Sequence, residues 1–309
     1  MIDKTTYETP TKFKKVSYLG EFIKDKTAIL GLIIAGWFLL WSLIQGLLEE
    51  IASVTNDPRL GYILLPSNPF TTNPAASLEA PSFHSLALIF GTNFLGESIL
   101  SRMLYSLPRD AIVAVIVVFV AIIAGSLLGI VSGFMGGWIE NVIMRITDAF
   151  LSIPALILVI AISIPLKEGF NAVIIALSIV WWPTYARFFR GQTLKIKNMD
   201  YMQAAKLNGV RRHSLFFRYL FLNSIDPVIA YAALDFGNVI LTYATLAFLG
   251  IGLTIPIPEL GAMASNGLGY LPADWWYAVF PSVTILIIVA GFVLVGDRYQ
   301  DIINNRIDY

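Results

Sequence analysis

Six long stretches without a charged side chain are the feature that most constrains this chain. No Asp, Glu, Lys or Arg occurs at 27–48, 111–139, 149–166, 169–186, 236–258 or 275–296. Each stretch is about as long as a helix that crosses the hydrocarbon core, which needs roughly 20 apolar residues. Only 14% of the residues are charged, far fewer than the surface of a soluble domain of this size requires. We therefore predict an all-α polytopic membrane protein with six transmembrane helices.

The basic residues predict the orientation of these spans. If both termini are cytoplasmic, 17 of the 21 Lys and Arg residues fall on the cytoplasmic side. Only Arg59, Arg102, Arg109 and Lys167 lie outside or at the membrane edge. Because cytoplasmic loops carry an excess of Lys and Arg, we expect both termini in the cytoplasm of a multi-pass cell-membrane protein. We expect a lipid bilayer, and no nucleic acid, among its partners.

The spans divide the chain into four parts. We expect a cytoplasmic arm and first span at 1–48, an extracellular segment at 49–106, a core of five spans at 107–298 and a cytoplasmic tail at 299–309. Apolar residues at helical spacing between lysines predict an interfacial helix over 11–26. The extracellular segment contains several Asn-Pro and Asp-Pro turn signals. An apolar pattern returns at 95–107, which we expect to lie on the membrane surface.

The longest cytoplasmic stretch between spans, 187–224, has helical rather than loop character. Asp200 is a possible N-cap, and Gly209 is a helix-stop signal. Ala204, Ala205 and Gly209 predict a face of small residues that another protein could approach closely. The alternative is a surface helix that merely contains alanines.

Several motifs in order along the chain give a resemblance to a known family. Residues 203–205 (QAA) followed by Gly209 resemble the E-A-A-x-x-x-G signature of binding-protein-dependent ABC importer permeases. Further matches narrow the resemblance to the DppC/OppC type, the peptide-importer permeases. These matches are 91–96 (GTNFLG) with 100–105 (LSRMLY), 136–138 (GGW), 144–148 (MRITD), 151–154 (LSIP), 182–191 (WPTYARFFRG), 247–252 (AFLGIG) and 261–263 (GAM).

The resemblance implies a MetI-like permease core and a mechanism of alternating access. It implies a coupling helix at about 197–215 that docks into a groove of an ATPase subunit. The implied coupling residues are Asp200, Gln203, Ala204, Ala205, Leu207 and Gly209. It also implies a related but distinct second permease, two ATP-binding subunits and an external binding protein that delivers di- or oligopeptides. Oligosaccharides are a close second substrate class, since some relatives carry them.

The sequence departs from the pattern of this group at several positions. Gln203 stands where the signature has Glu, Asn93 where the group has Asp, and Leu222 where a Pro usually follows. Tyr243 occupies a position that is often acidic, whereas Asp235 is an additional acid within the fifth span. We expect Asp235, Tyr243 and Asn238 to line the translocation path, and hence to bear on the substrate. The structural alternative for Asp235 is a pairing, with Arg145 or with the neighbouring permease.

No catalytic or metal-binding residue is predicted in this chain. A phosphate-binding G-x-x-x-x-G-K-[ST] loop is absent from the sequence, so ATP and Mg²⁺ are expected on partner subunits. The only two histidines, His84 and His213, lie outside the spans, which argues against a metalloenzyme. A secondary transporter and a non-transport scaffold remain as alternatives. The former would more often show an internal repeat, and neither needs a docking helix for an ATPase.

Overall fold

The computed structural model describes residues 22, 25–167, 169–252 and 256–307. Within these residues the regular elements are helices, and a single isolated β-bridge joins Thr92 and Ser98. The fold is therefore all-α, as predicted. The interfacial helix predicted for 11–26 lies almost wholly outside the described residues.

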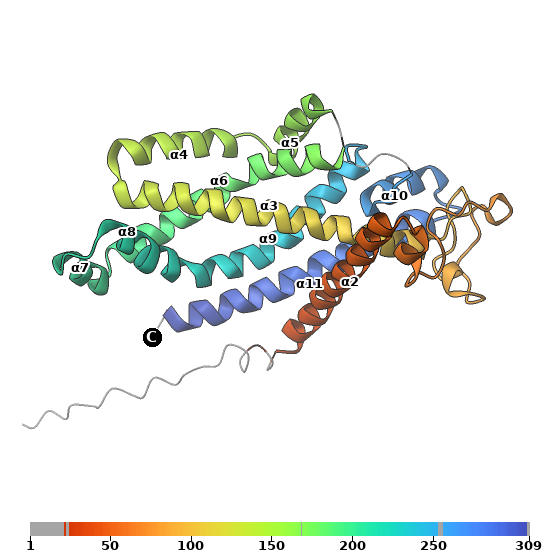
Figure 1. Cartoon of the computed structure of the whole chain (residues 1–309), viewed down its shortest axis with the longest axis horizontal. Coiled ribbons are helices and arrows are strands. Elements are labelled where there is room, and N and C mark those ends of the chain that lie inside the picture. The colour runs from red at the N-terminus through yellow and green to blue at the C-terminus, as the bar shows by residue number, and fades with distance from the viewer. Residues whose placement is uncertain (1–21, 23–24, 168, 253–255, 308–309) are drawn as a thin grey trace, which may run out of the picture.

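Among the described residues, five helices are long and apolar enough to cross a membrane. They are α2 (Lys26–Thr55), α3 (Ile99–Met135), α6 (Phe170–Lys197), α9 (Leu222–Phe248) and α11 (Trp276–Ile307). A helix satisfies its backbone hydrogen bonds within one segment, which the bilayer core demands. Figure 1 shows that α3, α6, α9 and α11 run side by side along the long axis of the molecule.

The predicted third span is broken into two pieces. Helix α4 (Gly137–Leu151) precedes a turn, after which α5 (Ala155–Ser163) continues into η4 (Ile164–Leu166). The two pieces are bent by 89°, and Pro154 stands directly before α5. Proline disfavours helical backbone in the residue before it, so the helix cannot pass smoothly through this point. The described chain therefore has five spans, or six if the bent pair counts as one.

A row of glycines brings α3 and α6 together. Gly125, Gly129 and Gly133 are spaced four residues apart on one face of α3. A Cβ atom at any of them would overlap α6, at Tyr185, at Ala186 or at Thr193. Small residues at this spacing let membrane helices approach closely, so these glycines fix the most extensive helix contact of the core.

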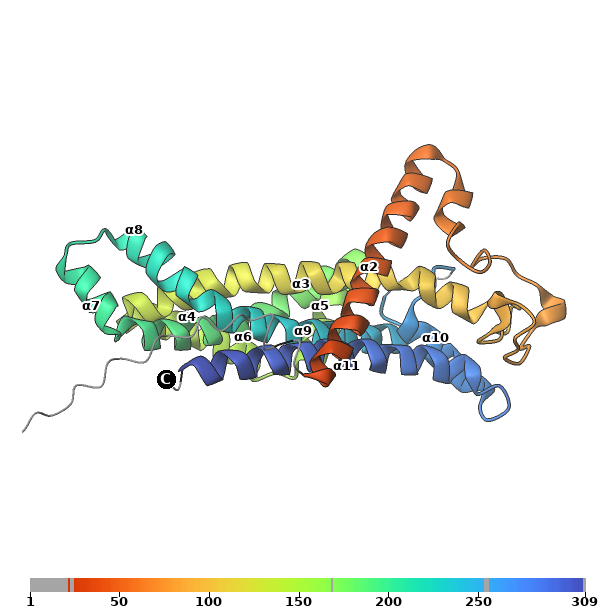
Figure 2. The same cartoon turned by 90° about the horizontal axis from the view of Figure 1, so that it is seen from below.

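Helix α2 leans away from the other spans and leads into the segment predicted to be external, 49–106, which keeps the name extracellular segment below (Figure 2). It crosses α11 where Gly31 faces Gly291, and a Cβ atom on either would overlap the opposite helix. The segment contains three short 3₁₀ turns, η1 (Pro58–Tyr62), η2 (Pro74–Ala76) and η3 (Leu86–Leu88). It lies at the end of the molecule opposite α7 and α8.

The end of this segment differs from the expectation that 95–107 lies on the membrane surface. Helix α3 begins at Ile99, and the Ser98 hydroxyl caps it by accepting a hydrogen bond from the Ser101 amide. The span thus starts 12 residues before its charge-free stretch. An N-cap oxygen satisfies one of the amides that a helix start leaves free, which favours this start.

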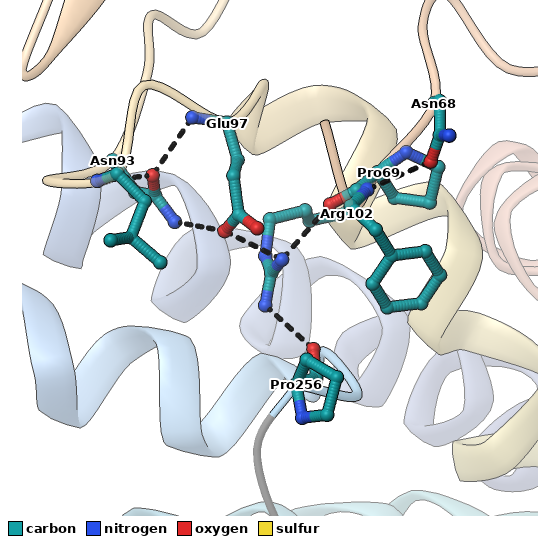
Figure 3. A network of polar contacts seen from close by, with 8 residues as sticks. Asn68, Pro69, Asn93, Glu97, Arg102 and Pro256 are labelled. Carbon is teal, nitrogen blue, oxygen red and sulfur yellow. Dashed lines mark hydrogen bonds and ion pairs between the residues drawn. The ribbon is translucent and has the colours of Figure 1, made fainter. Parts of the chain in front are cut away.

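The Arg102 side chain joins three separate segments at the end of the molecule where the extracellular segment lies (Figure 3). Its guanidinium donates to the carbonyl oxygens of Pro69, in the extracellular segment, and Pro256, between α9 and α10. It also forms a 2.6 Å ion pair with Glu97. The Asn93 amide donates to the same Glu97 oxygen at 2.7 Å. The extracellular segment is therefore bound to the core by a buried polar network.

Short helices complete the two ends of the bundle. Helix α7 (Asp200–Leu207), α8 (Arg212–Ser214) and the π-helical η5 (Leu215–Phe221) connect α6 to α9. At the other end, α10 (Leu260–Gly267) and η6 (Leu268–Tyr270) connect α9 to α11.

Candidate coupling and translocation sites

Helix α7 projects from the end of the bundle opposite the extracellular segment (Figure 1). The prediction that Asp200 caps its start is wrong. Met199 is the N-cap, with extended backbone, and Asp200 is the first helical residue without a side-chain capping bond. Its carboxylate is still stabilised there, because the amino end of a helix favours negative charge.

Gly209 ends the helix, as predicted. The Gly209 amide donates to the Lys206 carbonyl, and the Val210 amide donates to the Ala205 carbonyl. These two bonds are those of a Schellman motif, whose turn residue adopts left-handed backbone. Gly209 has a φ of +70°, which glycine adopts without the strain that a Cβ atom brings.

The predicted face of small residues does not form as expected. Ala205 is only 7% exposed, because it shares the inward face of α7 with the fully buried Met202, three residues earlier. Ala204 and Gly209 remain exposed. The sequence shows the spacing of the two alanines. The direction in which each side chain points depends on how α7 packs against α6 and η5.

The outward face of α7 carries an exposed apolar side chain. Leu207 is 90% exposed, and Asp200, Gln203 and Ala204 are exposed on the turns before it. The rings of Tyr201 on α7 and Tyr219 on η5 stack with centroids 6.5 Å apart, and burial raises the pKa of Tyr201 above its ordinary value. One side of α7 is thus packed against the rest of the chain, whereas Leu207 is exposed on the other side.

Asp235 lies inside the contact between α6 and α9 and is 3% exposed. The Trp181 indole donates a 2.7 Å hydrogen bond to its Oδ2 atom. Tyr185 and Asn238 also interact with this carboxylate. The alternative pairing with Arg145 is therefore wrong, since the neighbours of Asp235 are neutral donors on α6 and on its own helix.

The other two predicted path residues differ in exposure. Tyr243 is fully buried, where its hydroxyl interacts with Glu259, just before α10. Asn238 is exposed on the surface of α9. Of the three residues, only Asn238 is presented on the outside of the described chain.

Ion pairs hold α4 against α6. Asp148 pairs with Arg187 at 2.7 Å, and Glu140 pairs with Arg190. Arg145 lies three residues from Asp148 on α4, but Arg187 on α6 is the residue that pairs with the carboxylate.

Helix α4 also carries a polar row that the sequence interpretation missed. Asn141, Arg145, Asp148 and Ser152 are all exposed and follow helical spacing. Trp138 and Ile146, also exposed, belong to an apolar row beside it. The spacing of four, three and four residues between polar side chains is a signal that could have revealed this face.

These elements define a multi-pass, all-α membrane subunit with a MetI-like permease core. Residues 125–309 match the model of the family described as "Binding-protein-dependent transport system inner membrane component". That range is more than half of the chain. The chain therefore belongs to this family of ABC transporter permeases, which are inner-membrane subunits of systems that work with a substrate-binding protein and an ATPase.

Individual relatives extend the similarity over nearly the whole chain. The probable D,D-dipeptide transport system permease protein DdpC of Escherichia coli (strain K12) is 40% identical over 72% of this chain and 74% of its own length. The dipeptide transport system permease protein DppC of Haemophilus influenzae is 32% identical over 97% of this chain and 99% of its own. The oligopeptide transport system permease protein OppC of Bacillus subtilis is 33% identical over 71% and 72%. The resemblance to DppC/OppC-type permeases is confirmed.

Proposed function

We propose that this permease imports di- or oligopeptides that an external binding protein delivers, and that α7 docks on an ATPase subunit. The exposure of Leu207 is the observation that supports the docking role most directly. Met202 and Ala205 pack the inward face of α7 and leave Leu207 90% exposed, so a partner could cover Leu207 without disturbing that packing. The peptide substrate is proposed from the printed names of the relatives.

The proposed assembly contains this chain, a related second permease and two ATP-binding subunits. ATP and Mg²⁺ bind to the ATPase subunits, and α7 transmits their closure to α6 and η5 through Met202 and Tyr201. Both termini are cytoplasmic in this proposal, because that orientation puts α7 and most basic residues in the cytoplasm. The extracellular segment and the ends of α3 and α10 then face the binding protein.

The translocation path is proposed to run along the exposed polar positions of the core. Asn238 on α9 and the polar row of α4 support this, because a charged or amide side chain on a membrane helix must face protein or water. Asp235 and Tyr243 are buried in the described chain. They would join the path only if α6 and α9, or α9 and α10, separate during transport.

Reconstitution of the whole complex tests this function. The chain would be co-expressed with its neighbouring permease, ATPase subunits and binding protein, purified and placed in liposomes that contain ATP. We expect ATP-dependent uptake of labelled dipeptides and no uptake without the binding protein. Uptake of oligosaccharides in place of peptides would reassign the substrate, and ion-driven uptake by the isolated chain would contradict the proposed mechanism.

A further inference from the structure

A cavity surrounded by three cations lies next to α7, facing the turn that joins α3 to α4. Its volume is about 360 Å³. Its lining residues are Phe134, Met135, Lys197, Lys206, Arg212 and Leu215. The three basic residues come from three helices, since Lys197 ends α6, Lys206 is on α7 and Arg212 begins α8. No acidic side chain is among these lining residues.

The positive charge of this cavity is not compensated within the described chain. The Lys197 ammonium donates to the carbonyl oxygens of Gly133 and Phe134, at 3.3 and 3.1 Å. None of the ion pairs formed among the described residues involves Lys197, Lys206 or Arg212. The three like charges repel each other across the cavity. An anion that enters it is attracted by all three cations and relieves this repulsion. Lys and Arg together are the donors that commonly bind phosphate groups.

The surroundings of the cavity point to an anion with an apolar part. Phe134 and Leu215 supply an apolar side to the lining. Met135, which ends α3, is 57% exposed, and Trp138, at the start of α4, is 77% exposed. Exposed tryptophan is enriched where a membrane protein passes the interface between lipid and water. Basic pockets on the cytoplasmic side of membrane proteins are suited to anionic lipid headgroups.

We propose that this cavity binds the phosphate of an anionic phospholipid, with the acyl chains directed toward Met135 and Trp138. A bound headgroup would join α6, α7 and α8 through one ligand. Lys206 directly precedes Leu207, so the lipid would restrain the helix that presents Leu207. This last consequence rests on the proposed docking role of α7, whereas lipid binding itself does not.

Native mass spectrometry of the purified complex can test the proposal. The complex would be titrated with phosphatidylglycerol and, separately, with phosphatidylcholine, and the bound lipid counted at each concentration. The test variant is Lys206→Gln/Arg212→Gln. The matched control is Lys195→Gln/Arg211→Gln, which removes two exposed neighbouring cations that do not line the cavity.

We expect the wild-type complex to bind phosphatidylglycerol more tightly than phosphatidylcholine. The test variant should weaken the phosphatidylglycerol preference by about 25-fold, since it removes two basic residues and each one near a membrane surface contributes about fivefold to the attraction of anionic lipid. The control should keep the wild-type preference. Arg212→Lys retains the charge and should also keep it, which guards against a fold defect in the double variant.

Three results would overturn the proposal. Equal losses in the test and control variants would show a general attraction of the basic surface. Binding of inorganic phosphate to the wild-type complex but not to the test variant, with no phosphatidylglycerol bound to either, would show that the cavity takes a free phosphate. Absence of bound lipid only when the ATPase subunits are present would show that a partner protein occupies the cavity.

Discussion

The Trp181 indole on α6 donates a 2.7 Å hydrogen bond to the Asp235 carboxylate on α9. The bond joins two spans at a buried position, where a carboxylate without donors is costly. Among the residues that the structure describes, the groups that bond this carboxylate are the neutral side chains of Trp181, Tyr185 and Asn238. This relationship makes Asp235 a structural link between α6 and α9 in the described conformation.

Replacing Trp181 by Phe should destabilise the chain more than replacing Asp235 by Asn. The Phe variant leaves the carboxylate with one donor fewer, at a cost of about 2 kcal/mol. The Asn variant keeps an oxygen that can accept from the indole, so it should cost less. Denaturation of the purified complex by SDS, followed by far-UV circular dichroism, measures both changes. A variant of Asp235 that alters peptide selectivity but not stability would instead favour a role in the path.

The contact between α3 and α6 predicts opposite effects for two glycine substitutions. Gly129→Ala places a methyl group against the Ala186 carbonyl, and overpacking of this kind costs about 1–3 kcal/mol. Gly191→Ala, on the exposed side of α6, meets nothing within 4 Å. It should be neutral or stabilise the helix by up to about 1 kcal/mol. Thermal unfolding of the two variants provides the comparison, and equal stability would contradict the proposed close packing.

The span positions and the end of α7 could be predicted because their signals are local. A bilayer excludes unpaired charge, so charge-free stretches mark the spans, and Gly209 directly supplies the backbone that a helix end needs. The break before Pro154 lies inside an apolar region that gives no change of hydropathy. Contacts such as Trp181 with Asp235, or Arg187 with Asp148, join residues that are far apart in the sequence. Local spacing cannot show them, and it likewise could not show that Ala205 faces inward.

Three substitutions separate docking by α7 from its folding. Leu207→Asp should lower the ATPase activity that the loaded binding protein stimulates by about tenfold, because it places a charge in a contact that would otherwise be apolar. Gly209→Asn should have little effect, since Asn tolerates left-handed backbone, whereas Gly209→Val should lower coupling through strain of about 1–2 kcal/mol. Stimulated ATPase activity in liposomes is the measurement. Wild-type coupling in the Leu207→Asp complex would argue that α7 does not contact the ATPase.

The Arg102 network explains why an amide rather than an acid at position 93 suits this chain. Asn93 is 2% exposed and Glu97 is 3% exposed, and the Asn93 amide donates to the carboxylate that also pairs with Arg102. Asn93→Asp would replace that donor by a second carboxylate. Two like charges in a buried site cannot both be stabilised by one guanidinium.

We therefore expect Asn93→Asp to lower the free energy of detaching the extracellular segment from the core by about 1–3 kcal/mol. Limited proteolysis of the complex from the external side, with cleavage between residues 56 and 98 as the readout, measures this change. Asn73→Asp is the matched control, because Asn73 is exposed in the same segment and its side chain makes no capping hydrogen bond. Arg102→Met should open the segment further, since it leaves the buried Glu97 carboxylate without its cation, and breaking such a pair costs about 3–5 kcal/mol. Adding Glu97→Gln to Arg102→Met should recover part of the loss, because the unpaired charge is then gone. If cleavage were equally slow in Asn93→Asp and Asn73→Asp, the network would not be what holds the extracellular segment to the core.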